Sequence, residues 1–461
     1  MAAPKNTWKV AIAGECMVAR PFAMHDDDRS MGVINLLRDA DLTYAHFEMN
    51  IANYSELEYP AKGDWLGSYM MSDPEVARDL KWAGVDIMSL AHNHSLDFGN
   101  TGVMATIKHC KAAGIAVAGT GADLEEAREP GYLEKKKGRV ALVSASSGNK
   151  PNEWASLPKA GLRGRPGINP LRVNFKYMLE KEAAEQMKNI ARKLDVLREA
   201  GSSTSSVGIK GGEFSFQMPG DQSTRGSNVF VAGDRFEIQS SCHRKDLEGN
   251  LRSIDEAMKM ADLVIVAHHF NIADGKRGDK TPMFVREFAH AAIDAGADIY
   301  VGHGWHSTLG IEVYKGKPII YGIGNFFAQS EFIRRVTYDS YESWGHDTDR
   351  LPTLNPAAYP LHPGLDSHSE TWWTSALTVV EIQNGKVSQI KLHPIDLGRV
   401  AKSGEITRQT GQGEHKLTEG RPILAEGETA VRTLERIKKL SAGYGTNFVI
   451  EDGVGVVRFA G

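Results

Sequence analysis

Short apolar runs alternate with helical patterns over residues 9–144 and again over residues 255–321. Runs such as residues 85–90 and 262–267 are rich in apolar side chains, which is typical of strands buried inside a domain. Strands that alternate with helices predict βαβ units, in which helices cover the faces of a sheet. We therefore expect an α/β chain whose sheets are buried on both faces.

The alternation stops between residues 148 and 249. Residues 148–152 and 163–167 are loop-like because both contain Gly and Pro, and residues 208–212 are rich in glycine. Between the last two of these segments, residues 177–200 have the charged, amphipathic pattern of a solvated helix. We interpret residues 148–249 as an insertion over the core that shapes the pocket.

The C-terminal part of the chain has a β-rich pattern. Residues 376–382 and 387–392 flank Asn384-Gly385, and residues 448–450 and 454–459 flank Asp452-Gly453, so each pair predicts a hairpin. Residues 428–440 have a helical pattern. We expect one dominant core over residues 1–400 and an extension of helix and β-hairpin over residues 401–461.

Composition excludes several classes of protein. The 461 residues are 41% hydrophobic, and 54 Lys and Arg against 58 Asp and Glu give a formal charge of −4, which argues against a disordered chain or a basic nucleic-acid binder. No run of about 18 apolar residues and no apolar leader is present, so we expect no membrane contact and no secretion. Three scattered cysteines predict reduced thiols and a cytoplasmic location.

Five polar clusters follow predicted strands, and histidine is prominent in them. In open α/β sheets, binding sites form outside the carboxyl ends of the strands, so clusters far apart in sequence can converge there. A lone histidine after a strand is more often structural, but five clusters in the same position favour a shared site. The clusters are residues 14–20, 46–50, 91–99, 267–270 and 302–306.

The side chains in these clusters are those of a transition-metal site. Imidazole, carboxylate and amide oxygen together suit Mn, Fe or Zn rather than a calcium cage. Two metals about 3.5–4 Å apart need a bridging carboxylate and several terminal ligands. We expect one or two divalent metals. His303 and His306 can face one centre only if Gly304 permits a turn.

The clusters resemble those of the CapA family of poly-gamma-glutamate and capsule synthesis proteins, a branch of the calcineurin-like metallophosphoesterases. The third cluster reads SLAHNHSLDFG over residues 89–99, close to the family's Leu-Ala-Asn-Asn-His-x-Leu-Asp-x-Gly. The last reads GHGWH over residues 302–306 and continues to GNF at residues 324–326. The resemblance extends from about residue 10 to residue 328 and implies a four-layer αββα sandwich with an insertion and a C-terminal β-rich extension.

The resemblance also implies roles for individual residues. Glu48 would be the bridging carboxylate and Asn93 the amide-oxygen ligand. The implied metal ligands are Glu15, Glu48, Asn93, His269, His303 and His306. His94 would act near the reacting group as acid or orienter. We add His92 and Asp97 to His94 as the predicted catalytic set. Arg20 matches a family arginine that would hold a substrate anion, together with His25 and with Trp305 as an aromatic wall.

Four departures from the family pattern predict a specialised pocket. His46-Phe47-Glu48-Met49 is an unusual second block. Glu15 replaces aspartate and extends the carboxylate by one methylene. His92 replaces asparagine and adds a candidate ligand or base. Trp305 stands where proline is common.

Three functions follow as hypotheses. The first is a soluble metal-dependent hydrolase that uses metal-activated water on a small anionic substrate, either a phosphoester or a glutamyl-type amide. The second is a metal-dependent lyase or epimerase in which histidines transfer protons. The third is a non-catalytic binding module in capsule polymer assembly. The sequence leaves open the oligomeric state and whether His362 or His368 reaches the site.

Overall fold

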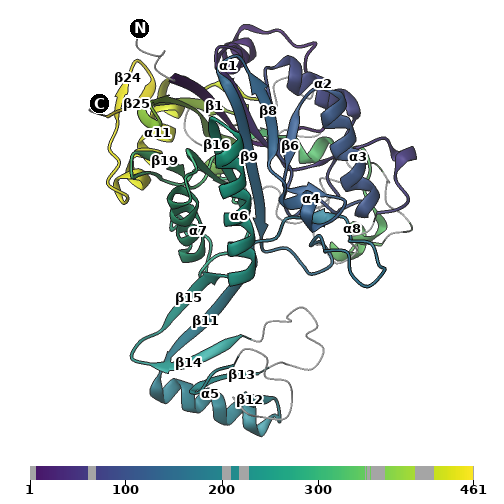
Figure 1. Cartoon of the computed structure of the whole chain (residues 1–461), viewed down its shortest axis with the longest axis vertical. Coiled ribbons are helices and arrows are strands. Elements are labelled where there is room, and N and C mark those ends of the chain that lie inside the picture. The colour runs from purple at the N-terminus through teal and green to yellow at the C-terminus, as the bar shows by residue number, and fades with distance from the viewer. Residues whose placement is uncertain are drawn as a thin grey trace.

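Two mixed β-sheets stack face to face at the centre of the molecule (Figure 1). The computed structural model describes residues 7–60, 69–199, 209–216, 228–347, 349, 354, 369–399 and 420–459. Within these ranges, no helix combines the length and the apolar character needed to cross a bilayer.

The first sheet has ten strands in the order β24-β25-β22-β21-β1-β2-β5-β6, with β20 paired to β1 and β23 to β22. Strands β1, β2, β5, β6 and β20 are parallel, whereas the C-terminal strands add to β1 in antiparallel fashion. The bounds are β1 (Thr7–Met17), β2 (Leu42–Phe47), β5 (Ile87–Ser89), β6 (Ala116–Ala118), β20 (Asn325–Ala328), β21 (Thr374–Gln383), β22 (Lys386–Asp396), β23 (Ile423–Leu424), β24 (Val449–Glu451) and β25 (Val454–Arg458).

The second sheet has six strands in the order β18-β19-β17-β16-β9-β8. Its central strands β9, β16, β17 and β19 are parallel, and β8 and β18 close the two edges as antiparallel strands. The bounds are β8 (Gly131–Lys135), β9 (Gly138–Ser147), β16 (Leu263–Phe270), β17 (Ile299–His303), β18 (Ile311–Tyr314) and β19 (Lys317–Ile320).

Alternation along the strands divides the core into layers. On β1, Val10 and Ile12 pack between the sheets, while Ala11 and Ala13 face the helices on the outer side. Figure 1 shows the helices on the two sides of the stacked sheets. Helices α1 (Asp28–Arg38), α2 (Pro74–Trp82) and α3 (Gly99–Ala112) cover the first sheet, and α6 (Arg244–Met260) and α7 (Met283–Asp294) cover the second. This αββα arrangement confirms the predicted four-layer fold.

The C-terminal segment joins the core rather than forming separate layers. Helix α11 (Gly427–Ala442) buries Leu434 and Ile437 in the core between the sheets, and β24 and β25 extend the first sheet. The helix and the second hairpin thus occur where the sequence predicts them. The proposed boundary at residue 401 lies outside the described residues.

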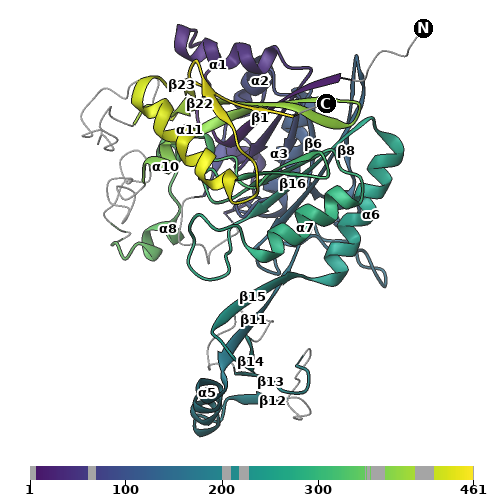
Figure 2. The same ribbon diagram turned by 90° about the vertical axis from the view of Figure 1, so that its left-hand side faces the viewer.

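The insertion contains a third sheet that projects away from the layered body (Figures 1 and 2). The sequence prediction of a helix over residues 177–200 was too long, because residues 173–180 alternate in burial and pair with β14 and β15 as a strand. The elements are β11 (Val173–Glu180), α5 (Lys181–Lys193), β12 (Leu197–Glu199), β13 (Glu213–Phe216), β14 (Val229–Gly233) and β15 (Glu237–Cys242).

One part of the insertion that reaches the strand ends is its first loop. The Asn149 side chain donates to the carbonyl oxygen of His92 over 3.2 Å. The pocket-shaping role of residues 148–249 stays a prediction. The remaining short elements are β3 (Asn50–Ile51), η1 (Tyr54–Glu56), β4 (Met71–Ser72), β7 (Thr120–Gly121), α4 (Leu124–Arg128), β10 (Gly167–Ile168), η2 (Ser330–Phe332), α8 (Tyr338–Ser343) and α10 (Glu370–Trp373).

Candidate metal centre

The carboxyl ends of strands from both sheets meet at one place and bring two groups of three side chains together. In the first sheet, Glu15 of β1 lies opposite His46 of β2, and in the second sheet His269 of β16 lies opposite His303 of β17. The two groups are the histidine trio, His46, His269 and His303, and the carboxylate trio, Glu15, Glu48 and His306. In each trio, the candidate ligand atoms lie within 4.8 Å of one another.

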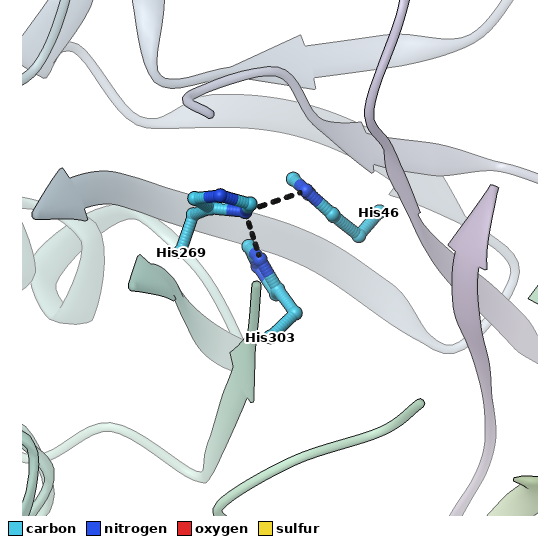
Figure 3. A group of neighbouring side chains, drawn as sticks. All are labelled: His46, His269 and His303. Atoms are coloured by element: carbon cyan, nitrogen blue, oxygen red, sulfur yellow. Dashed lines mark hydrogen bonds between the residues drawn. The ribbon is translucent and has the colours of Figure 1, made fainter. Parts of the chain in front are cut away.

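The histidine trio is fully enclosed, and its nitrogens face one another (Figure 3). Nδ1 of His269 lies 3.1 Å from Nε2 of His46 and 3.2 Å from Nδ1 of His303. The His46 and His303 rings stack with centroids 3.5 Å apart. Ser89 Oγ lies 2.8 Å from Nδ1 of His46 and fixes the ring so that Nε2 faces the trio. Three converging imidazole nitrogens match the donor set of a transition metal.

The carboxylate trio is held together by His306. Nδ1 of His306 lies 3.1 Å from Oε2 of Glu15 and 3.7 Å from Oε2 of Glu48, and its backbone N–H donates to Oε1 of Glu15 over 3.2 Å. Asn325 of β20 adds a contact of 3.0 Å to Nδ1. Gly14 allows this approach of the segment before β20, because a Cβ at residue 14 would lie 2.3 Å from the carbonyl oxygen of Gly324.

Glu48 lies between the two trios. Its Oε1 is 4.0 Å from Nε2 of His269, and its Oε2 faces His306. Both Glu48 oxygens and the Nε2 atoms of His269 and His303 are buried and have no hydrogen-bond partner among the described residues. Burying a carboxylate without hydrogen-bond partners is costly, so these atoms fit a site that is completed by cations. The residues present therefore fit one or two divalent metals, with Glu48 placed to bridge them.

Burial and charge give the two trios different protonation. Burial lowers the pKa of His46 to about 3, and it lowers the pKa values of His269 and His303 well below the usual range, so these imidazoles are neutral as metal ligation requires. Burial also raises the pKa of Glu48. Burial opposes the charge on His306, but Glu48 and Glu15 raise its pKa to about 9. The carboxylates that hold this proton would equally attract a divalent cation.

The turn between His303 and His306 depends on glycine. Gly304 has φ +112°, and a Cβ there would lie 2.3 Å from the carbonyl oxygen of Phe270. His306 itself adopts φ 57°. Only a residue without a side chain at 304 lets β17 turn sharply enough for both histidines to face the centre.

Replacing Gly304 with alanine is therefore expected to destabilise the fold by about 2 kcal/mol or more, because strain and a backbone clash add. Thermal unfolding of the metal-free protein measures this. Gly445→Ala is the matched control, since Gly445 also has positive φ (+77°) but no atom within 4 Å of the added Cβ. An equal loss of stability in both variants would mean that close packing at residue 304 is unimportant.

The loop after β5 orders the predicted catalytic residues beside the trios. Nδ1 of His94 lies 2.7 Å from Oδ2 of Asp97, which also accepts the backbone N–H of Met70 over 2.8 Å. The backbone N–H of His94 donates to Nδ1 of His92 over 3.1 Å. The His92 ring lies 5.6 Å from that of His46 between centroids, so this loop adjoins the histidine trio. Asn93 is buried in the same turn, and its role as a ligand stays a prediction.

The predicted substrate-binding residues have other contacts. The Arg20 guanidinium lies over the Phe332 ring at 5.1 Å, and Trp305 packs on Phe270 at 5.4 Å between centroids. His25 is partly exposed near Arg20 and Arg421, and both arginines, together with burial, lower its pKa. The roles of Arg20, His25 and Trp305 stay predictions. His362 and His368 lie outside the described residues.

The sequence patterns do not predict two residues that lie at the centre. His46 is a member of the histidine trio, but the sequence patterns place it only in the second cluster and not among the predicted metal ligands. Trp372 packs on His306 with centroids 4.4 Å apart, in the position of an aromatic wall. The signal for His46 was its place two residues before Glu48 at the end of an apolar strand. No sequence pattern marked Trp372.

Comparison with known proteins identifies relatives of nearly the whole chain and of parts of it. An uncharacterised protein of Sinorhizobium fredii is 29% identical over 97% of this chain and 92% of its own length. A capsule biosynthesis protein CapA of Bacillus anthracis is 24% identical over 63% of this chain and 51% of its own length. A probable polyglutamine synthesis accessory protein of Mycobacterium tuberculosis is 26% identical over 52% of this chain and 44% of its own length. The matches to these two named relatives cover about half of their length.

A family model matches most of the chain and includes every residue of the two trios. The matched family is described as bacterial capsule synthesis protein PGA_cap, and the match covers residues 9–330. The family has a metallophosphoesterase-like fold, in agreement with the two stacked sheets between layers of helix. From the extent of this match, the chain belongs to the bacterial capsule synthesis protein family PGA_cap.

Proposed function

We propose that this chain is a metal-dependent hydrolase that acts on a small anionic substrate, either a phosphoester or a glutamyl-type amide. The observation that supports this most is the position of Glu48, whose two buried oxygens face His269 of one trio and His306 of the other. Two ligand groups that share a carboxylate are the arrangement of hydrolytic two-metal sites. Mn, Zn and Fe each suit the mixed nitrogen and oxygen donors.

A divalent metal bound to the trios supplies Lewis acidity and lowers the pKa of coordinated water toward neutrality. The chain's own residues supply orientation and proton transfer. Asp97 holds Nδ1 of His94 at 2.7 Å and so orients the imidazole that we assign to proton transfer. His92 is fixed through its Nδ1 by the backbone of His94, so it supplies a second imidazole beside the histidine trio.

The setting of the reaction is also a proposal. Two relatives are named for capsule biosynthesis and for polyglutamine synthesis, which favours a substrate connected with polymer synthesis. The three cysteines, Cys16, Cys110 and Cys242, are buried thiols, which supports a reducing compartment such as the cytoplasm.

Removal of metal is expected to abolish hydrolysis. Chelated protein would be assayed with bis(p-nitrophenyl) phosphate, p-nitrophenyl phosphate and γ-glutamyl-p-nitroanilide, before and after addition of Mn, Zn or Fe(II). At least one probe should be cleaved, with a rate that falls by about 10³-fold on chelation and returns with metal.

Two results would contradict the hydrolase assignment. One is full activity in a protein shown to be free of metal. The other is product that contains no oxygen from ¹⁸O-labelled water, which would favour the lyase or epimerase alternative.

A further inference from the structure

The loop between β16 and α7, residues 271–282, is fastened at the rim of the metal centre. Arg277 Nη2 donates to the carbonyl oxygen of Asn271, which follows His269 by two residues. Oδ2 of Asp274 accepts the backbone N–H of Met283 over 2.6 Å. Asp279 pairs with Arg436 of α11 over 2.7 Å. The first of these contacts holds the Arg277 guanidinium at Asn271, just beyond the end of β16, which carries His269.

Arg277 forms no ion pair with any carboxylate in the part of the chain that the structure describes, and the residue is exposed. It nevertheless lies within electrostatic reach of the carboxylate trio. Although the residue as a whole is exposed, desolvation of its guanidinium lowers the pKa of Arg277, while the charges of Glu15 and Glu48 act in the opposite direction. Once cations neutralise those carboxylates, the positive charge of Arg277 is available to a ligand.

We propose that Arg277 anchors the anionic oxygen group of the substrate at the rim of the metal centre, an inference that rests on the proposed function. The guanidinium fork matches two oxygens of a phosphoryl or carboxylate group. Arg277 is already held by one N–H to the Asn271 carbonyl, so little side-chain freedom remains to be lost on binding. This assigns to Arg277 the anchoring role that the sequence resemblance implied for Arg20, whose guanidinium lies over Phe332.

The test measures anion binding rather than turnover. Inorganic phosphate and glutarate would each be titrated by calorimetry into wild type, Arg277→Gln, Arg277→Lys and Lys276→Gln, after incubation with Mn²⁺ and measurement of metal content. Lys276 is the matched control, because it is the exposed cation next to Arg277 on the same loop. Arg277→Gln should weaken binding of at least one anion by about tenfold or more, since a charged hydrogen-bond donor is lost. Arg277→Lys should recover part of the affinity, and Lys276→Gln should stay within about twofold of wild type.

The outcomes separate this inference from the proposed function. If the protein holds no Mn²⁺, the proposed function fails. The anion affinities of Arg277→Gln and wild type still decide whether Arg277 is the anchor. Binding of both anions within twofold of wild type in Arg277→Gln overturns the anchoring role, as does wild-type protein that binds neither anion. Equal weakening in Lys276→Gln also overturns it, because the loop's net charge would then explain the effect.

Discussion

Replacing Glu48 with glutamine is expected to abolish activity and yet leave the metal-free protein at least as stable as wild type. Glutamine has nearly the same shape but lacks the second carboxylate oxygen and the charge that would bridge two cations, so kcat should fall by about 10³-fold or more. Both Glu48 oxygens are buried without hydrogen-bond partners among the described residues. Removing an ionisable group from such a place should raise the free energy of unfolding of metal-free protein by up to about 1 kcal/mol.

Steady-state kinetics, metal content and chemical unfolding with chelator together check this prediction. Glu312→Gln is the control, because Glu312 is a partly buried carboxylate outside both trios that accepts a hydrogen bond from Tyr321. It should keep metal content and activity while losing some stability. Glu48→Gln protein that keeps both its metal content and its kcat would show that Glu48 is not a ligand.

Replacing His46 with asparagine is expected to remove metal from the histidine trio and to lower activity by about 10²-fold or more. The variant loses the Nε2 atom that lies 3.1 Å from Nδ1 of His269 and the ring that stacks on His303. The carboxylate trio is unchanged, so the metal content should fall by about one ion per chain rather than to zero. Elemental analysis after gel filtration, with kinetics at saturating Mn²⁺, measures both effects.

His268 supplies the matched control for this variant. It is also a buried histidine at the end of a core strand, but its ring nitrogens contact Ser147 and Tyr300 rather than the trio. His268→Asn should therefore lower stability and retain metal. If His46→Asn keeps two metals and His268→Asn loses one, the assignment of the histidine trio is wrong.

Much of the site's location could be predicted from the sequence, because it depends on where apolar strands end. Glu15, Glu48, His269, His303 and His306 each lie at or just after a strand with a strong apolar pattern, and the structure brings all five together. The α/β class follows from the same alternation of strands and helices, whereas the four layers were implied by the resemblance to the CapA family. Whether these five residues bind metal stays a prediction.

His46 could not be separated from a structural histidine by pattern alone. It lies within β2, where all six residues are buried, and a histidine there resembles a satisfied core residue. Its partner in the pairing of β1 with β2 is Glu15, and that pairing includes a register shift between Ile12 and Glu15. A shift of this kind depends on tertiary contacts, such as that of Gly14 with the segment before β20, which local sequence does not encode.

The insertion was harder to predict because its strands depend on distant partners. Residues 173–180 include charged and polar side chains and run directly into the amphipathic helix α5, so a single helical pattern fits both. Pairing with β14 and β15, which come later in the chain, decides that these residues form a strand. Arg277 was missed for a related reason, since its loop is positioned by contacts with Asn271 and with α11 rather than by a motif.

A crystal structure of Mn-loaded protein, with anomalous scattering measured at the metal edge, tests the central claim most directly. We expect two ions about 3.5–4 Å apart. One should be bound by His46, His269 and His303, the other by Glu15 and His306, with Glu48 contacting both. A single ion that leaves either trio without metal, or ions bound elsewhere in the chain, would contradict the two-metal centre.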